Sequence, residues 1–215
     1  MPTTSLTGAP AGRRLTDNTL VRWLPLAGVG FAALQIGGNL VIDKFPDETT
    51  SSGSLVRYYA THHAQVQRGG ELLAFSGLFL GLFVAGLVVR CRHHFGAAAV
   101  IAVGGAAMLA AEVASGSTYA LLGSIGTDSS VDPAALQAWH IAGAAFGIGV
   151  ASMVFLLGVA VAGTLADALP RWVAWTALVL AVAHLTPFGF LASLLLLPWA
   201  LAVGITLTIR PTAMD

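Results

Sequence analysis

The chain has 215 residues, of which 56% are hydrophobic and only 9% are charged, and its formal net charge is zero. Ten acidic and ten basic side chains cannot cover the surface of a water-soluble domain of this size, which excludes the soluble, disordered and coiled-coil classes. A mean hydropathy of +0.81 indicates a polytopic membrane protein, and the balanced charge offers no basic field that would attract nucleic acid.

Residues 1–18 are polar and lack the apolar segment of a cleavable signal, so we expect a short disordered cytoplasmic tail there. Five long apolar stretches follow, namely Trp23–Ile42, Leu72–Val89, Gly96–Ser124, Trp139–Gly163 and Trp172–Ile209. A helix needs about 20 apolar residues to cross the hydrocarbon, and each of the first four stretches suffices for one crossing. The last is about twice that length, and Thr186–Gly189 divides it because Pro stops a helix and Gly permits a tight turn.

We therefore predict an all-α fold, a polytopic transmembrane helical bundle over residues 19–210 followed by a short cytoplasmic tail, 211–215. Six spans are expected, with a short first half to the final hairpin, or five if one half of that hairpin is re-entrant. The first outer loop contains an amphipathic pattern over Ser54–Gln67. This helix is expected either to lie over the outer mouth of the bundle or to lead straight into the second span.

Basic residues near the span ends set the expected orientation in the cell membrane. With the N-terminus inside, seven bases lie on the inner face and three on the outer face, which favours cytoplasmic termini; the inner set is Arg13, Arg14, Arg22, Arg90, Arg92, Arg171 and Arg210, and the outer set is Lys44, Arg57 and Arg68. Tryptophans near span ends are typical of an interfacial belt; they are Trp23, Trp139, Trp172 and Trp199.

Polar side chains inside the spans are the default functional candidates, because hydrocarbon penalises them unless they are partnered. Glu112 is the deepest, and Ser115 and Tyr119 share its helical face. Gln35 and Asn39 lie one turn apart in the first span, with Asp43 one turn further. Glu71, His140 and His184 lie near the outer ends of the second, fourth and fifth spans. Together they predict a polar-lined cavity in the outer half of the bundle, above an apolar floor.

Each of these residues also has a purely structural interpretation. Glu112 could be a protonated acid bonded to a neighbouring Ser or Asn, and the two amides could join helices. The histidines could be interfacial or satisfied in the core. The pairs His62-His63 and His93-His94 lack the His-x3-His spacing of two ligands on one helix face, so no metal site is predicted.

Four short motifs carry a resemblance to known proteins. Phe45-Pro46-Asp47 and Leu55-Val56-Arg57-Tyr58-Tyr59 precede the second span, Leu169-Pro170-Arg171-Trp172-Val173-Ala174-Trp175 opens the fifth, and the final hairpin contains Leu185-Thr186-Pro187-Phe188-Gly189-Phe190. The chain in these regions resembles small multi-pass membrane proteins of high-GC Gram-positive bacteria, loosely the DUF4386-type group. The resemblance implies a helical bundle of this topology and supplies no catalytic residues. In size and in its buried acid, the chain is also similar to small membrane-integral terpenoid cyclases, an architectural similarity without a matching motif.

The leading functional hypothesis is an enzyme that acts by acid–base chemistry on a lipophilic, isoprenoid-like molecule. Hydrocarbon favours the neutral form of a carboxyl group, so Glu112 could act as the general acid, and Glu71, Asp43 or His140 could take the proton back. The expected substrate contacts are Gln35, Asn39, Tyr58, Tyr59, Ser115, Tyr119, Trp139 and His184, with the aromatic rings stabilising a carbocation. The expected partners are membrane lipid and a lipophilic small molecule, and no cofactor is required.

Three alternatives remain at this point. The chain could be a non-catalytic lipid-binding or accessory subunit with a membrane-protein partner. It could be a haem-binding redox protein with His140 and His184 as axial ligands. A transporter is less well supported, because no inverted repeat is evident in the sequence.

Overall fold

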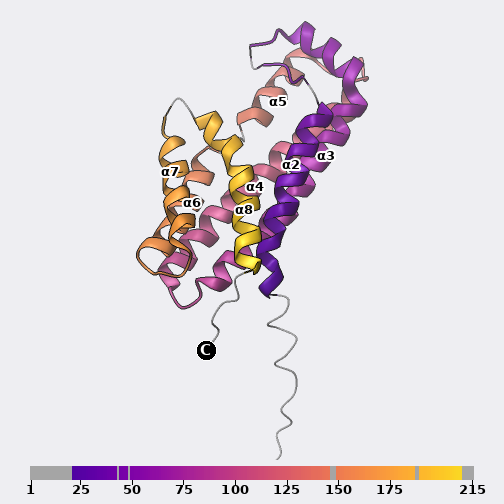
Figure 1. The fold of residues 1–215 in the computed structure, drawn as a ribbon. Coiled ribbons are helices and arrows are strands. Elements are labelled where there is room, and N and C mark those ends of the chain that lie inside the picture. Colours follow the sequence, from indigo (N-terminus) through magenta and orange to yellow (C-terminus); the bar gives the residue numbers. More distant parts are fainter. Residues whose placement is uncertain (1–20, 43, 48, 146–148, 187–188, 210–215) are drawn as a thin grey trace, which may run out of the picture.

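The computed structural model describes residues 21–42, 44–47, 49–145, 149–186 and 189–209 (Figure 1). Every regular element within these ranges is a helix, which confirms the predicted all-α bundle. The helices are η1 (Leu24–Leu26), α2 (Ala27–Ile42), α3 (Ser52–Arg90), α4 (Phe95–Ile125), α5 (Pro133–Ala145), α6 (Gly149–Thr164), α7 (Arg171–Ala183) and α8 (Gly189–Ile209). The two predicted tails, Asp43 and Pro187-Phe188 lie outside the described residues.

Within the described ranges, five helical segments are long and apolar enough to cross a membrane. They are Val21–Ile42, Ser52–Arg90, Phe95–Ile125, Pro133–Thr164 and Leu191–Ile209, the fourth being made of α5 and α6. Helix α7 is apolar but has only 13 residues, so it rises about 20 Å against the roughly 30 Å of the hydrocarbon core. The predicted final hairpin with a short first half is therefore present as α7 and α8, and the chain is a multi-pass membrane protein.

Helix α3 is one continuous helix of 39 residues that includes the predicted loop helix Ser54–Gln67. Of the two arrangements expected for that segment, the continuous one is observed. Figure 1 shows α3 and α4 side by side, with α5 near the far end of α3 and with α7 and α8 packed against the other half of the bundle. We call the end that carries Val21 and Ile209 the termini end, and the end that carries residues 126–132 the loop end.

Close contact between α3 and α4 depends on glycine. A Cβ atom added at Gly116 of α4 would lie 2.8 Å from Cα of Ala74, and one added at Gly70 of α3 would lie 2.8 Å from the carbonyl oxygen of Gly116. Real Cβ atoms do not approach backbone this closely, so the two helices meet where side chains are absent. This contact sets the rotation of α3 and thereby decides which of its side chains face inward.

The described residues form two separate apolar clusters in the interior. The larger extends from the middle of the bundle to the termini end and includes Phe31, Phe83, Met108 and Phe155. The smaller lies toward the loop end, among α2, α3, α4 and α5; its buried members are Ile42, Leu55, Tyr59, Val66, Leu73, Tyr119, Leu122 and Leu136. The larger cluster is the apolar floor that the sequence predicts.

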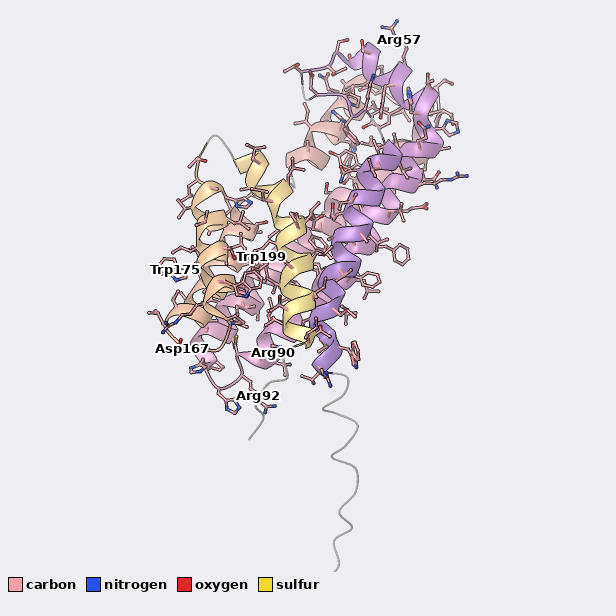
Figure 2. All side chains as sticks on the ribbon, in the orientation of Figure 1. Arg57, Arg90, Arg92, Asp167, Trp175 and Trp199 are labelled. Carbon is pink, nitrogen blue, oxygen red and sulfur yellow. The ribbon has the colours of Figure 1, made fainter. Side chains whose placement is uncertain are left out.

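The tryptophans divide into two groups. Trp23, Trp139 and Trp172 are exposed, in agreement with an interfacial position. Trp199 was expected in the same belt, and that expectation is wrong: it is 6% exposed, donates a hydrogen bond to Oγ1 of Thr176 at 3.0 Å and lies edge-on to the ring of Phe83. Trp199 lies at the middle of α8 rather than at its end, so its ring packs into the core (Figure 2).

Candidate functional site

A cavity of about 480 Å³ lies near Glu112, where residues of both apolar clusters approach each other. Its volume falls within the range of small-molecule sites, about 300–1,000 Å³. Helices α2, α3, α4, α5, α6 and α8 all contribute to its wall, together with His184 at the end of α7. Its lining residues are Gln35, Asn39, Leu73, Ala111, Glu112, Ser115, Tyr119, Gly143, Ala144, Gly149, His184, Gly189, Ser193, Leu194 and Leu197.

Glu112 is only 5% exposed, and its two carboxyl oxygens have different surroundings. Oε2 accepts a hydrogen bond from Nε2 of Gln35 at 2.5 Å. Oε1 is buried and has no hydrogen-bond partner among the described residues. A buried polar atom without a hydrogen bond costs free energy, so a ligand that forms a hydrogen bond with this oxygen would remove that cost.

The amide of Gln35 is oriented by Ser76, a residue of α3 behind it. Oγ of Ser76 donates its single proton to the backbone oxygen of Leu73 at 2.6 Å, so toward Gln35 it can only accept. The atom 3.0 Å from it must therefore be the amide nitrogen of Gln35. The second N–H of that nitrogen is directed to Oε2 of Glu112. Because Oε2 is an acceptor, a neutral Glu112 carries its proton on Oε1.

His184 contributes an imidazole to the same cavity. Its Nδ1 lies 2.7 Å from the backbone oxygen of Leu180. A carbonyl oxygen only accepts, so Nδ1 carries the proton and, in the neutral ring, Nε2 is an acceptor. Nε2 lies 3.4 Å from Oγ of Ser193, which also lies 3.1 Å from the backbone oxygen of Gly189. The cavity therefore brings together a candidate proton donor, Glu112, and a candidate proton acceptor, His184.

A second cavity, of about 490 Å³, lies toward the loop end and shares Ala144 with the first. His140 lines it, 1% exposed, with Nδ1 2.8 Å from the hydroxyl of Tyr59. The ring of Phe45 is stacked on His140 at 5.6 Å and meets the ring of Tyr119 edge-on at 4.5 Å. Since Tyr119 lines the first cavity, aromatic side chains separate the two spaces.

The single site expected from the sequence is thus divided. Of its residues, the first cavity brings together Gln35, Asn39, Glu112, Ser115, Tyr119 and His184. Glu71 does not line it: this side chain is exposed and bonds to Gln67 on the surface of α3. The reason is the glycine contact, because Gly70 faces α4 and the next residue is rotated by about 100° away from it.

The remaining predicted contacts also lie outside the first cavity. Tyr59 is fully buried against His140, and Tyr58 packs on Tyr59 and on the ring of His62. Trp139 is 50% exposed, because the neighbouring His140 takes the inward position on α5. The wall closest to the loop end is instead formed by Gly143 and Ala144, with Oγ of Ser115 donating to the backbone oxygen of Gly143 at 2.9 Å.

The two histidines considered as haem ligands line different cavities, His140 the second and His184 the first. Within the described parts of the chain, no group of three or more His, Cys, Asp or Glu side chains is placed to hold a metal ion.

Two residues of the site, Ser76 and Ser193, were not identified from the sequence. Each is a lone serine in an apolar stretch. A serine in a helix can bond to the carbonyl three or four residues earlier, as both do here, so its presence is a weak signal of function. Compared with protein-family models, curated proteins and solved structures, the chain has no significant match.

Proposed function

We propose that the protein is a membrane-integral enzyme that acts by acid–base chemistry on a lipophilic, isoprenoid-like molecule held in the first cavity, with Glu112 as the acid. The observation that carries the proposal is that Glu112, whose Oε1 is buried and unpartnered among the described residues, lines a cavity of small-molecule size. The apolar part of the lining suits a hydrocarbon chain; it includes Leu73 of α3 and Leu194 and Leu197 of α8.

The proposed reaction is an isomerisation that needs no co-reactant. Neutral Glu112 gives its proton to an oxygen of the substrate, and the C–O bond breaks with its electron pair staying on that oxygen. The π pair of an alkene in the same molecule then forms a C–C bond to the cationic carbon. A C–H proton is lost to Nε2 of His184, and its return to Glu112 restores the enzyme. His184 takes the role first considered for Glu71 or His140, because it shares the cavity with Glu112.

The test is turnover of a polyprenyl epoxide by the purified protein in lipid nanodiscs, with cyclised products separated by chromatography and identified by mass. Wild type is expected to form product and Glu112→Gln to form none, since an amide does not transfer a proton. Glu71→Gln is the matched control, because this exposed carboxyl group lies outside the cavity. Equal turnover by wild type and Glu112→Gln would remove Glu112 as the acid.

A second candidate is a non-catalytic lipid-binding or accessory subunit. The observation in its favour is that the Ser76–Gln35–Glu112 chain of hydrogen bonds joins α3, α2 and α4, a structural task that needs no chemistry. On this alternative, wild type and Glu112→Gln retain the same lipids through purification, and neither converts the epoxide.

We further propose that the protein lies in the cell membrane with both ends of the chain in the cytoplasm. The distribution of bases supports this: Arg90 and Arg92 lie at the termini end and Arg57 at the loop end (Figure 2). The first cavity would then open in the outer half of the bilayer. A cysteine introduced at Gly53 should react with a membrane-impermeant maleimide on intact cells, whereas one at Gly96 should react only after lysis.

A further inference from the structure

The polar atoms of the first cavity differ in the direction of their hydrogen bonds, and this asymmetry restricts the ligand. Oγ of Ser115 has given its proton to the backbone oxygen of Gly143. Among the described residues, the acceptors within reach of the proton on Oγ of Ser193 are the backbone oxygen of Gly189 and Nε2 of His184. Whichever it takes, neither Ser193 nor a neutral His184 keeps a proton for the cavity.

Glu112 differs from these serines and from His184. Its Oε2 is occupied by Gln35, which leaves Oε1 to donate when the acid is neutral. Asn39 also has N–H groups, but its side chain is exposed and one of them bonds to the backbone oxygen of Gln35. Among the described lining residues, Glu112 and the hydroxyl of Tyr119 are therefore the buried groups that can donate, whereas Ser115, Ser193 and His184 can accept.

We propose that the ligand is a lipophilic alcohol, whose one oxygen accepts a hydrogen bond from Glu112 and donates its own proton to the acceptors formed by His184 and Ser193. This inference rests on the proposed function and specifies its product class, because opening the C–O bond of an epoxide leaves an alcohol. A hydroxyl group can accept one hydrogen bond and donate another with one atom, and an epoxide yields such a hydroxyl once its oxygen is protonated and its C–O bond breaks. An ether or ketone serves only Glu112 and leaves buried acceptors without a donor.

The test compares ligands that differ only at the polar end. Geranylgeraniol, its methyl ether and geranylgeranylamine compete with radiolabelled geranylgeraniol for wild-type protein in nanodiscs. The alcohol is expected to bind about tenfold more tightly than the ether, the usual effect of one buried hydrogen bond. Equal affinity of alcohol and ether would overturn the inference, and so would tightest binding by the amine, which would indicate a carboxylate paired with a cation.

Two variants separate this inference from the enzymatic proposal. In Glu112→Gln, an amide N–H replaces the donor on Oε1, so the alcohol should bind within about threefold of wild type although turnover is lost. In Glu112→Leu the donor is absent, and the affinity for the alcohol should fall about tenfold. Binding that Glu112→Leu leaves unchanged would contradict the inference. If none of the three probes binds to wild type, the cavity does not hold a lipophilic ligand of this kind, and both proposals are wrong.

Discussion

The amide nitrogen of Gln35 lies 2.5 Å from Oε2 of Glu112 and 3.0 Å from Oγ of Ser76, so one side chain joins three helices. All three residues are at least 94% buried. Because Ser76 donates its proton to the backbone oxygen of Leu73, this arrangement fixes the amide and leaves the other oxygen of Glu112 without a partner among the described residues.

The first prediction concerns this pair. Gln35→Leu leaves both oxygens of Glu112 without a described partner, and we expect it to lower the free energy of unfolding by about 1–3 kcal/mol, measured by denaturation in mixed micelles. Adding Glu112→Leu should recover much of the loss, because the double variant buries no unpaired group. Asn39→Leu is the control and should change little. A double variant as unstable as the sum of its single variants would show that the two side chains are not coupled.

The second prediction concerns the contact of α3 with α4. Gly116→Val places a side chain against the backbone of Leu73 and Ala74, and we expect a loss of stability of about 1–3 kcal/mol or a separation of the two helices. Gly37→Val is the matched control, since a Cβ there meets nothing within 4 Å. Thermal unfolding of both variants in the same detergent gives the comparison. Similar melting temperatures for the two would mean that the helices do not pack as described.

The third prediction concerns two tryptophans. Trp175 is 58% exposed on the outside of α7, whereas Trp199 is 6% exposed in the core (Figure 2). Brominated lipids quench the fluorescence of rings that they touch. Trp175→Phe should therefore reduce the fraction of fluorescence that these lipids quench, and Trp199→Phe should increase it. The reverse pattern would mean that α8 is turned toward the lipid.

The fourth prediction concerns the loop beside the second cavity. Hydrogen bonds from the side chains of Thr49 and Thr50 hold the pKa of Asp47 below its ordinary value of 3.8. Because the folded-state pKa is lowered, the turn is stabilised above pH 3.8 and loses this support as the pH falls through the lowered value. A carboxyl NMR titration should show the low pKa in wild type. A combined Thr49→Val and Thr50→Val variant should return it toward 3.8, and an unchanged titration would rule out these bonds.

Much of the helical layout follows from the sequence, because long apolar stretches, Pro and Gly identify spans and their ends. The side-chain directions do not follow as readily. Glu71 was expected at the site because it lies at the outer end of the second span. The direction of its side chain, however, depends on whether Gly70 or its neighbour contacts α4. The side chains of helix α4 are small and apolar on nearly every face of the helix, so hydrophobic periodicity does not indicate which face contacts α3.

The candidate site was predictable to a similar extent. The residues around Glu112 that lie one turn apart along α2 and α4 were identified correctly as neighbours, since helical spacing alone places Gln35 with Asn39 and Glu112 with Ser115. The separation of His140 from His184 was not predicted, because it depends on the positions of α5 and α6 and on how Phe45 packs between the rings of His140 and Tyr119. Such tertiary contacts leave no periodic signal in one sequence.

The most direct measurement of the central claim is an infrared difference spectrum of the protein in nanodiscs, recorded on addition of geranylgeraniol. If a neutral Glu112 donates to the ligand, the carbonyl band of its carboxyl group should shift on addition of the alcohol. That change should be absent in Glu112→Gln and present in Glu71→Gln. A spectrum in which no carboxyl band changes, or in which Glu112→Gln gives the same change as wild type, would contradict a ligand-binding acid at this position.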